Sequence, residues 1–263
     1  MNDKILQQIK SLPPLPKSVL EIQRITNDPD SSIGDLIKIV KEDPMLTANL
    51  LKAANSPLYG FTKQIKNVDQ AVSLFGMSTV KGFAISFAIR NSIKFDLSAY
   101  GVSESGFHNV ASKRNAIAIN WFKRDRKKLD ILATNSFLID LGAVVISLVL
   151  NNDAKSESFK SRLQSGENRE MLEKEFVGET TTEITAEIFK HWNFSEDLIV
   201  SMQNIDSPKG EYKTESAALN VLKTLIEMTS PMSEENIKKA FEIAKNFELD
   251  VDALETALEL TKG

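Results

Sequence analysis

The chain has no cysteine and only two histidines, His108 and His191, among its 263 residues. Without cysteine there can be no disulfide, no thiolate metal site and no thiol nucleophile. Two histidines are also too few for the clusters of imidazoles that hold most hydrolytic metal ions. These absences argue against a metal-dependent catalytic centre.

Long hydrophobic runs are scarce as well. The most apolar window, residues 137–150, is too short to span a bilayer and contains Asp140 and Gly142. It predicts a buried core helix. The first ten residues are polar and amphipathic, unlike a signal peptide. We therefore expect a cytoplasmic, soluble protein without membrane insertion.

An excess of positive charge is also absent, since the formal net charge is −4. Such a balance gives no general attraction to nucleic acids or anionic membranes. One basic cluster, residues 123–128, is interrupted by Asp125 and follows Trp121 and Phe122, which are potential stacking groups. A solvated turn between helices accounts for it better than a nucleic-acid site does. Glycine-rich phosphate loops and dinucleotide fingerprints are absent too.

What the chain does contain is a long series of helical patterns. Helix-forming residues dominate, and no window of more than a few residues alternates with period two. The pattern predicts an all-α protein. Helices are expected at residues 16–27, 32–42, 44–54, 69–75, 78–90, 103–123, 130–150, 180–192, 195–204, 213–228, 233–246 and 251–260, with surface helices and loops in the polar segment 151–178.

Several of these helices carry recognisable start and stop signals. Ser32 and Asp35 have the spacing of a capping box. Asp43 is an expected N-cap with Pro44 in the first helical position, where a missing N–H costs nothing. Gly76 is an expected left-handed C-cap, and Ser78 or Thr79 is expected to cap the next helix.

The helix expected at residues 44–54 stops at the sequence Asn55-Ser56-Pro57. Asn55 and Ser56 can satisfy the last carbonyls and the turn amides, while Pro57 blocks continuation of the helix. The alternative is that these side chains face a partner. We favour the structural interpretation.

Four segments in order, residues 12–16, 31–36, 43–60 and 68–80, resemble the HDOD domain, a regulatory relative of the HD phosphohydrolases. The resemblance is specific over residues 12–89 and looser over 103–204. It implies a single all-α unit over residues 1–263, with a helical N-terminal subdomain (1–95) packed on a degenerate HD-type helical bundle (96–263). Asp43, Pro44, Asn55, Ser56, Pro57 and Gly76 would be family-motif residues with structural roles.

The resemblance also implies where the catalytic site of the HD relatives has decayed. Residues 137–142 resemble the segment with the His-Asp pair, so Ile139 replaces the histidine and Asp140 remains. The other metal-ligand positions of the relatives match Asn109 (one residue after His108), Thr181, Gln203 and Asn204. One aspartate without imidazole partners is too poor a site for a hydrolytic metal. We therefore expect no catalytic, metal or cofactor-binding residue and no cofactor.

Asp140 has two interpretations. In the first, it is a vestigial carboxylate that binds either a metal cation or the amine or guanidine group of a ligand. In the second, it is a buried acid that is hydrogen-bonded to neighbouring groups. We favour the second, because buried carboxylates are usually paired within the protein.

Together with the eroded metal-ligand positions, the resemblance implies a non-enzymatic bacterial signalling module that acts by protein–protein interaction. Its expected partners are other signalling proteins: a kinase, a response regulator or a cyclic-dinucleotide protein. Two alternatives stay open. One is a sensor of a nucleotide or metabolite, bound between the two helical halves. The other is a residual metal-dependent phosphohydrolase at Asn109, Asp140, Thr181 and Gln203.

Overall fold

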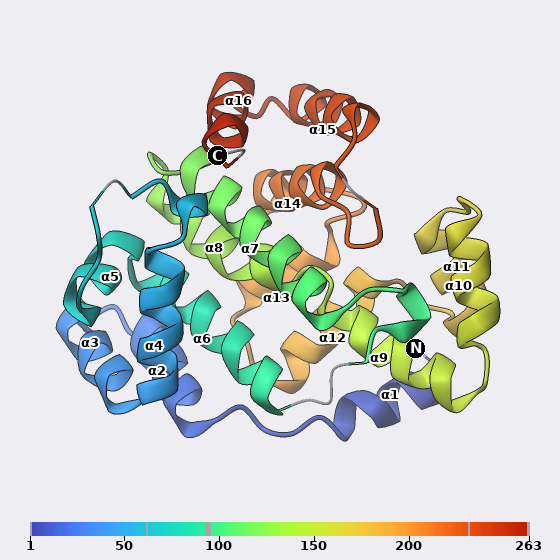
Figure 1. Cartoon of the computed structure of the whole chain (residues 1–263), viewed down its shortest axis with the longest axis horizontal. Coiled ribbons are helices and arrows are strands. Elements are labelled where there is room, and N and C mark those ends of the chain that lie inside the picture. Colours follow the sequence, from blue (N-terminus) through green and yellow to red (C-terminus); the bar gives the residue numbers. More distant parts are fainter. Residues whose placement is uncertain (1, 62, 93–95, 231, 262–263) are drawn as a thin grey trace. The chain divides into compact units, whose positions relative to one another are not determined.

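The computed structural model describes residues 2–61, 63–92, 96–230 and 232–261. Every regular element among these residues is helical (Figure 1). The α-helices are α1 (Asp3–Lys10), α2 (Lys17–Asn27), α3 (Ile33–Glu42), α4 (Pro44–Ala54), α5 (Val68–Phe75), α6 (Met77–Ser92), α7 (Glu104–Trp121), α8 (Arg126–Leu138), α9 (Leu141–Asn152), α10 (Ser156–Gln164), α11 (Arg169–Val177), α12 (Thr181–His191), α13 (Glu196–Gln203), α14 (Lys213–Leu225), α15 (Glu234–Asn246) and α16 (Val251–Leu260). Two short 3₁₀ helices are η1 (Pro57–Tyr59) and η2 (Ser98–Tyr100). The all-α prediction is confirmed.

The predicted capping signals work locally as expected. Ser32 and Asp35 form a complete capping box at the start of α3. The Asp43 carboxylate accepts a hydrogen bond from the Leu46 amide, 3.0 Å away, and Pro44 opens α4. These contacts span only three residues, so the sequence alone determines them.

Two predicted boundaries differ from the structure around Gly76. This glycine has φ 78° and ψ 169°, so it lies outside the left-handed helical region expected of it. It joins α5 to α6 at a bend of 111°. Because α6 begins directly at Met77, Ser78 lies inside the helix, where its hydroxyl donates to Asp130 (2.6 Å) rather than capping the helix.

The helix predicted over residues 130–150 is broken at Ile139 and Asp140, which separate α8 from α9. Thr185 of α12 explains the break. Its hydroxyl donates to the Ile139 carbonyl (3.1 Å) and accepts from the Gly142 N–H (2.9 Å). A side chain from another helix thus bonds backbone groups at the break, a known cause of interrupted helices.

The polar segment 151–178, expected to hold surface helices and loops, contains α10 and α11. The two helices contact each other, and both contact α9. Phe159 of α10 and Leu172 of α11 are fully buried. This segment is therefore attached to the core by its own apolar residues.

The chain divides into two compact units, each built from distant parts of the sequence. Unit 1 comprises Met1–Pro13, Ile93–Ala111 and Leu138–Leu249, and unit 2 comprises Pro14–Ser92, Ser112–Phe137 and Asp250–Gly263. The predicted division into residues 1–95 and 96–263 stays a prediction, and residues 93–95 at that boundary lie outside the described part of the chain.

Each unit has its own helical core. In unit 1, α9 is central and contacts α1, α10, α11 and α12. In unit 2, α2 to α6 form a mutually contacting group, with contacts between α2 and α6, α3 and α5, and α4 and α5. Figure 1 shows these neighbouring helices within each unit.

Among the described residues, the helical stretch Arg126–Asn152 is long enough, and has an apolar enough window, to cross a membrane by length and composition. However, 94% of its most apolar window is buried within the protein. Burial of this kind is typical of the core helices of soluble proteins, so the prediction that residues 137–150 are buried is confirmed.

Candidate functional site

Asp140, the remaining acid of the HD-like segment, is paired with an arginine. It lies in the turn between α8 and α9, and its side chain is only 2% exposed. Arg169, the first residue of α11, places its Nη1 atom 3.2 Å from the Asp140 Oδ1 atom. The Arg169 side chain is itself only 11% exposed. A buried carboxylate therefore has a buried guanidinium as its counter-ion.

The same guanidinium contacts a second buried acid. Arg169 Nε lies 3.6 Å from Glu173 Oε1, one helical turn further along α11. Glu173 also accepts hydrogen bonds from the Thr181 amide (2.7 Å), the Thr181 hydroxyl (2.7 Å) and the Tyr100 hydroxyl (2.9 Å). We call Tyr100, Asp140, Arg169, Glu173 and Thr181 the Arg169 cluster.

Burial and charge act in opposite directions on this cluster. Burial raises the pKa of Glu173 above its usual range, although Arg169 and the Thr181 donors oppose the shift. Burial disfavours the charged form of Arg169, but the carboxylates of Asp140 and Glu173 outweigh it, so the arginine pKa rises. Arg169 therefore stays protonated, and its single positive charge is shared between the two acids.

The structure brings only some of the HD-like positions together. Asp140 and Thr181 both belong to the Arg169 cluster, and Ile139 is fully buried beside Asp140. Asn109 is exposed on α7, and Gln203 is exposed at the end of α13.

The last of these positions, Asn204, donates its side-chain amide to the Val200 carbonyl (3.0 Å) of its own helix. Among the residues that the structure describes, no group of three or more histidine, cysteine or acidic side chains is arranged to hold a metal ion.

The sequence did not indicate Tyr100, Arg169 or Glu173 as site residues. The last two were missed because α11 lies in a segment rich in charges. A signal was nevertheless present. Arg169, Leu172, Glu173 and Phe176 follow the spacing i, i+3, i+4, i+7, so two ionisable residues occupy the stripe that also carries the buried Leu172. Charged residues within an apolar stripe indicate buried pairing.

The family-motif residues of unit 2 have structural contacts. Besides capping α4, Asp43 accepts a hydrogen bond from the Ser18 hydroxyl (3.0 Å) of α2. The Asn55 side chain donates to the Ile65 carbonyl and accepts from the Ile65 amide, both at 2.9 Å. Ser56 accepts from the Leu58 amide at the start of η1. These side chains hold the segment after α4 in place.

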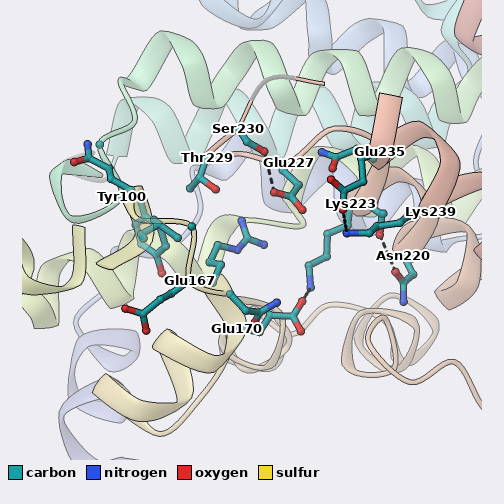
Figure 2. Close-up of a pocket in the computed structure, with 18 residues that line it drawn as sticks. Tyr100, Glu167, Glu170, Asn220, Lys223, Glu227, Thr229, Ser230, Glu235 and Lys239 are labelled. Atoms are coloured by element: carbon teal, nitrogen blue, oxygen red, sulfur yellow. Dashed lines mark hydrogen bonds and ion pairs between the residues drawn. The ribbon is translucent and has the colours of Figure 1, made fainter. Parts of the chain in front are cut away.

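A polar pocket of about 530 Å³ lies beside the Arg169 cluster, within unit 1 (Figure 2). Tyr100 and Arg169 contribute to its wall, together with residues of α14 and α15. Lys223 forms ion pairs with Glu170 and with Asp206 (2.6 Å for the latter). The sequence predicted a ligand cleft between residues 1–95 and 96–263, but all lining residues of this pocket belong to 96–263.

Two further pairs of residues lie on the lining of the same pocket. Lys239 pairs with Glu235 at 2.7 Å, and the Ser230 hydroxyl donates to Glu227 at 2.9 Å. Figure 2 shows these side chains around the pocket. Two lysines and an arginine of the lining are thus already paired with acids of the protein.

The basic cluster 123–128 spans the turn from α7 to α8 and the start of α8. Asp125, at that turn, accepts hydrogen bonds from the Lys128 amide and side chain. Trp121 is 5% exposed, and its indole N–H donates to the Asp250 carbonyl (2.8 Å). The tryptophan is thus occupied within unit 2 and not presented for stacking on bases.

Known proteins share this fold over its whole length. A virulence factor from Campylobacter jejuni subsp. jejuni is 27% identical, with a TM-score of 0.62, and the match covers 100% of this chain and 99% of that one. A protein from Shewanella amazonensis SB2B that carries the provisional name phosphohydrolase is 24% identical, with a TM-score of 0.71 and coverage of 99% and 94%.

Among curated sequences, an uncharacterized protein of Treponema pallidum (strain Nichols) is 32% identical over 82 residues. That match covers 31% of this chain and only 16% of the relative. The sequence model of the HDOD domain matches residues 12–208, well over half of the chain. The protein therefore belongs to the HDOD domain family.

Proposed function

We propose that this chain is a non-catalytic regulatory module of bacterial signal transduction that acts by binding other proteins. Membership of the HDOD family supports the regulatory role. The observation that carries the proposal is the ion pair between Arg169 and Asp140. The one acid retained from the HD-like segment is bound to a cation of the chain itself.

The chemistry of that cation explains why it does not replace a metal. A catalytic metal has an open coordination position where water binds and loses a proton. A guanidinium is always protonated, has no acceptor and coordinates no water as a Lewis acid. Ile139 and Thr181, at the expected histidine positions, supply no imidazole. The Arg169 cluster thus holds the helices together and has no route to hydrolysis.

The surface supports binding to proteins. Leu20, Met45, Leu74 and Met171 are large apolar side chains that are between 48% and 73% exposed. Single exposed apolar residues are common, but Leu74 also lines an apolar groove, and such surfaces are typical of docking sites. The partner classes that we propose are a kinase, a response regulator or a cyclic-dinucleotide protein.

The test combines purification with an assay. The tagged chain is expressed at its native level in its source bacterium, and co-purifying proteins are identified by mass spectrometry. We expect one signalling protein in near-stoichiometric amount. The purified chain is also tested for bound metal and for hydrolysis of bis(p-nitrophenyl) phosphate, beside a folded Asp140→Asn variant. Stoichiometric metal, with turnover that the Asp140→Asn variant loses, would contradict the proposal and establish a residual phosphohydrolase.

The polar pocket beside the Arg169 cluster supports a second candidate, a sensor of a small polar ligand. Its volume is within the range of ligand sites, and on its lining the Glu227 carboxylate accepts a hydrogen bond from the Ser230 hydroxyl. Thermal denaturation with a panel of nucleotides and polar metabolites tests it. A ligand that raises the melting temperature of the wild type but not of Glu227→Gln would favour the sensor.

A further inference from the structure

Unit 2 contains an apolar groove, which we call the α5 groove. It has a volume of about 660 Å³ and lies between the segment after η1 and helix α5. Phe61, Ile65 and Leu74 supply its apolar lining. Leu74, on α5, is 49% exposed, whereas Ile65 is buried at 8% exposure. The groove therefore leaves apolar surface in contact with water.

The walls of the α5 groove are held by hydrogen bonds. Asn55 bonds both the amide and the carbonyl of Ile65, and the Gln70 side chain accepts from the Lys66 amide (3.0 Å). Phe61 packs edge-on against Phe75, with ring centroids 5.4 Å apart. A groove that is already formed binds a ligand without the entropic cost of ordering its own walls.

The rim of the α5 groove is positively charged, although the whole chain has a net charge of −4. Its one acid, Asp69, is neutralised by Lys41 of α3, 2.7 Å away. Lys63 on the lining and Lys66 next to it are both exposed. Within the described part of the chain, neither lysine forms an ion pair. Two cations beside an apolar floor are complementary to a segment with acidic and apolar side chains.

We propose that the α5 groove is the docking site for an acidic, apolar segment of a partner protein. Apolar side chains of that segment lie on Phe61, Ile65 and Leu74, and its carboxylates pair with Lys63 and Lys66. This assignment rests on the proposed function and identifies the surface that performs it. It also gives the Asn55-Ser56-Pro57 motif a role beyond ending α4, since Asn55 holds the groove wall through Ile65.

The experiment is a selection of random twelve-residue peptides displayed on phage against the immobilised full chain. We expect enriched peptides that combine Leu or Phe with Asp or Glu. Their affinity, measured by fluorescence anisotropy, should fall at least tenfold for Leu74→Asp and for Lys63→Glu.

Matched controls test whether the loss is specific to the groove. Leu20 is 48% exposed on α2, so Leu20→Asp makes the same change at an equal exposure elsewhere in unit 2. Lys127→Glu reverses an exposed charge on α8. Both control variants should bind the selected peptides within twofold of the wild type.

Several outcomes would overturn the assignment. They are the absence of any enriched peptide, peptides enriched without acidic residues, and peptides that bind Leu74→Asp as well as they bind the wild type. Sedimentation with phosphatidylserine vesicles adds another, because vesicle binding lost in Leu74→Asp would assign the groove to a membrane surface. If the co-purified partner stays bound to Leu74→Asp, the proposed function stands and the groove assignment fails.

Discussion

At the scale of single residues, the side chain that decides the character of the HD-like site is Arg169. It lies between two buried carboxylates, Asp140 at 3.2 Å and Glu173 at 3.6 Å. Removing one partner of a buried ion pair costs more than the pair itself contributes, because an uncompensated charge is left behind. The stability of unit 1 should therefore depend strongly on this guanidinium.

We predict that Arg169→Ala lowers the free energy of unfolding by about 3–5 kcal/mol, the usual cost of breaking a buried ion pair. Urea denaturation followed by circular dichroism measures it. Arg162→Ala is the control, since Arg162 pairs with Glu167 and Glu175 on the surface and its loss should leave the free energy of unfolding nearly unchanged. Equal effects of the two substitutions would show that the cluster is not a buried network.

Asp140 also shows how far residue-level prediction reaches. Its position in an apolar run predicts burial, and the structure agrees. The arginine that pairs with it lies 29 residues further along the chain. No local pattern connects two residues so far apart, so the buried acid was predictable but its counter-ion was not.

At the scale of helices, contact between α9 and α12 depends on a glycine. A Cβ atom on Gly142 would overlap the Thr181 carbonyl oxygen and lie 3.0 Å from the Ile184 Cβ. A similar approach occurs in unit 2, where a Cβ on Gly82 of α6 would lie 2.7 Å from the Ala133 carbonyl oxygen of α8. The nearest neighbour in each case is a backbone carbonyl oxygen, which cannot turn away as a side chain can.

We predict that Gly142→Ala destabilises the protein by about 3 kcal/mol or more, because the added methyl group forces α9 and α12 apart. Gly34→Ala provides the comparison. A Cβ there meets only the Ser32 hydroxyl at 3.4 Å, so the better helix propensity of alanine should stabilise the protein by up to about 1 kcal/mol. Thermal melts of both variants measure the difference. A Gly142→Ala variant as stable as the wild type would rule out the close approach.

At the scale of the whole molecule, the pH dependence of stability should follow the carboxylates that have strong hydrogen-bond donors. The lowered pKa values include those of acids in both units, with the main donor after each: Asp35 (Ser32), Asp69 (Lys41) and Asp153 (Lys4). A carboxyl group whose pKa is lower in the folded state binds protons less readily there than in the unfolded chain. Its contribution to stability is present above the unfolded pKa and is lost as the pH falls through the folded pKa.

We therefore predict that the melting temperature is nearly constant from pH 7 to pH 5 and falls below about pH 4, the ordinary range of these acids. Glu173 has the opposite sign, because its pKa is raised, but it is one group against several. Melts at pH 7, 5 and 3 at constant ionic strength test this, and added salt should weaken the dependence because most of these pairs are exposed. A higher melting temperature at pH 3 would contradict the prediction.

The sequence by itself determined the helical class, most helix boundaries, the caps at Ser32 and Asp43 and the family. These features depend on contacts within one or two helical turns or on motifs in a fixed order, so they can be found along the chain. Only the tertiary structure decided the break at Ile139 and Asp140, the pairing of Arg169 with Asp140 and the apolar groove that Asn55 supports. Each of these requires side chains that are ten to nearly fifty residues apart to meet, and packing between helices sets such meetings.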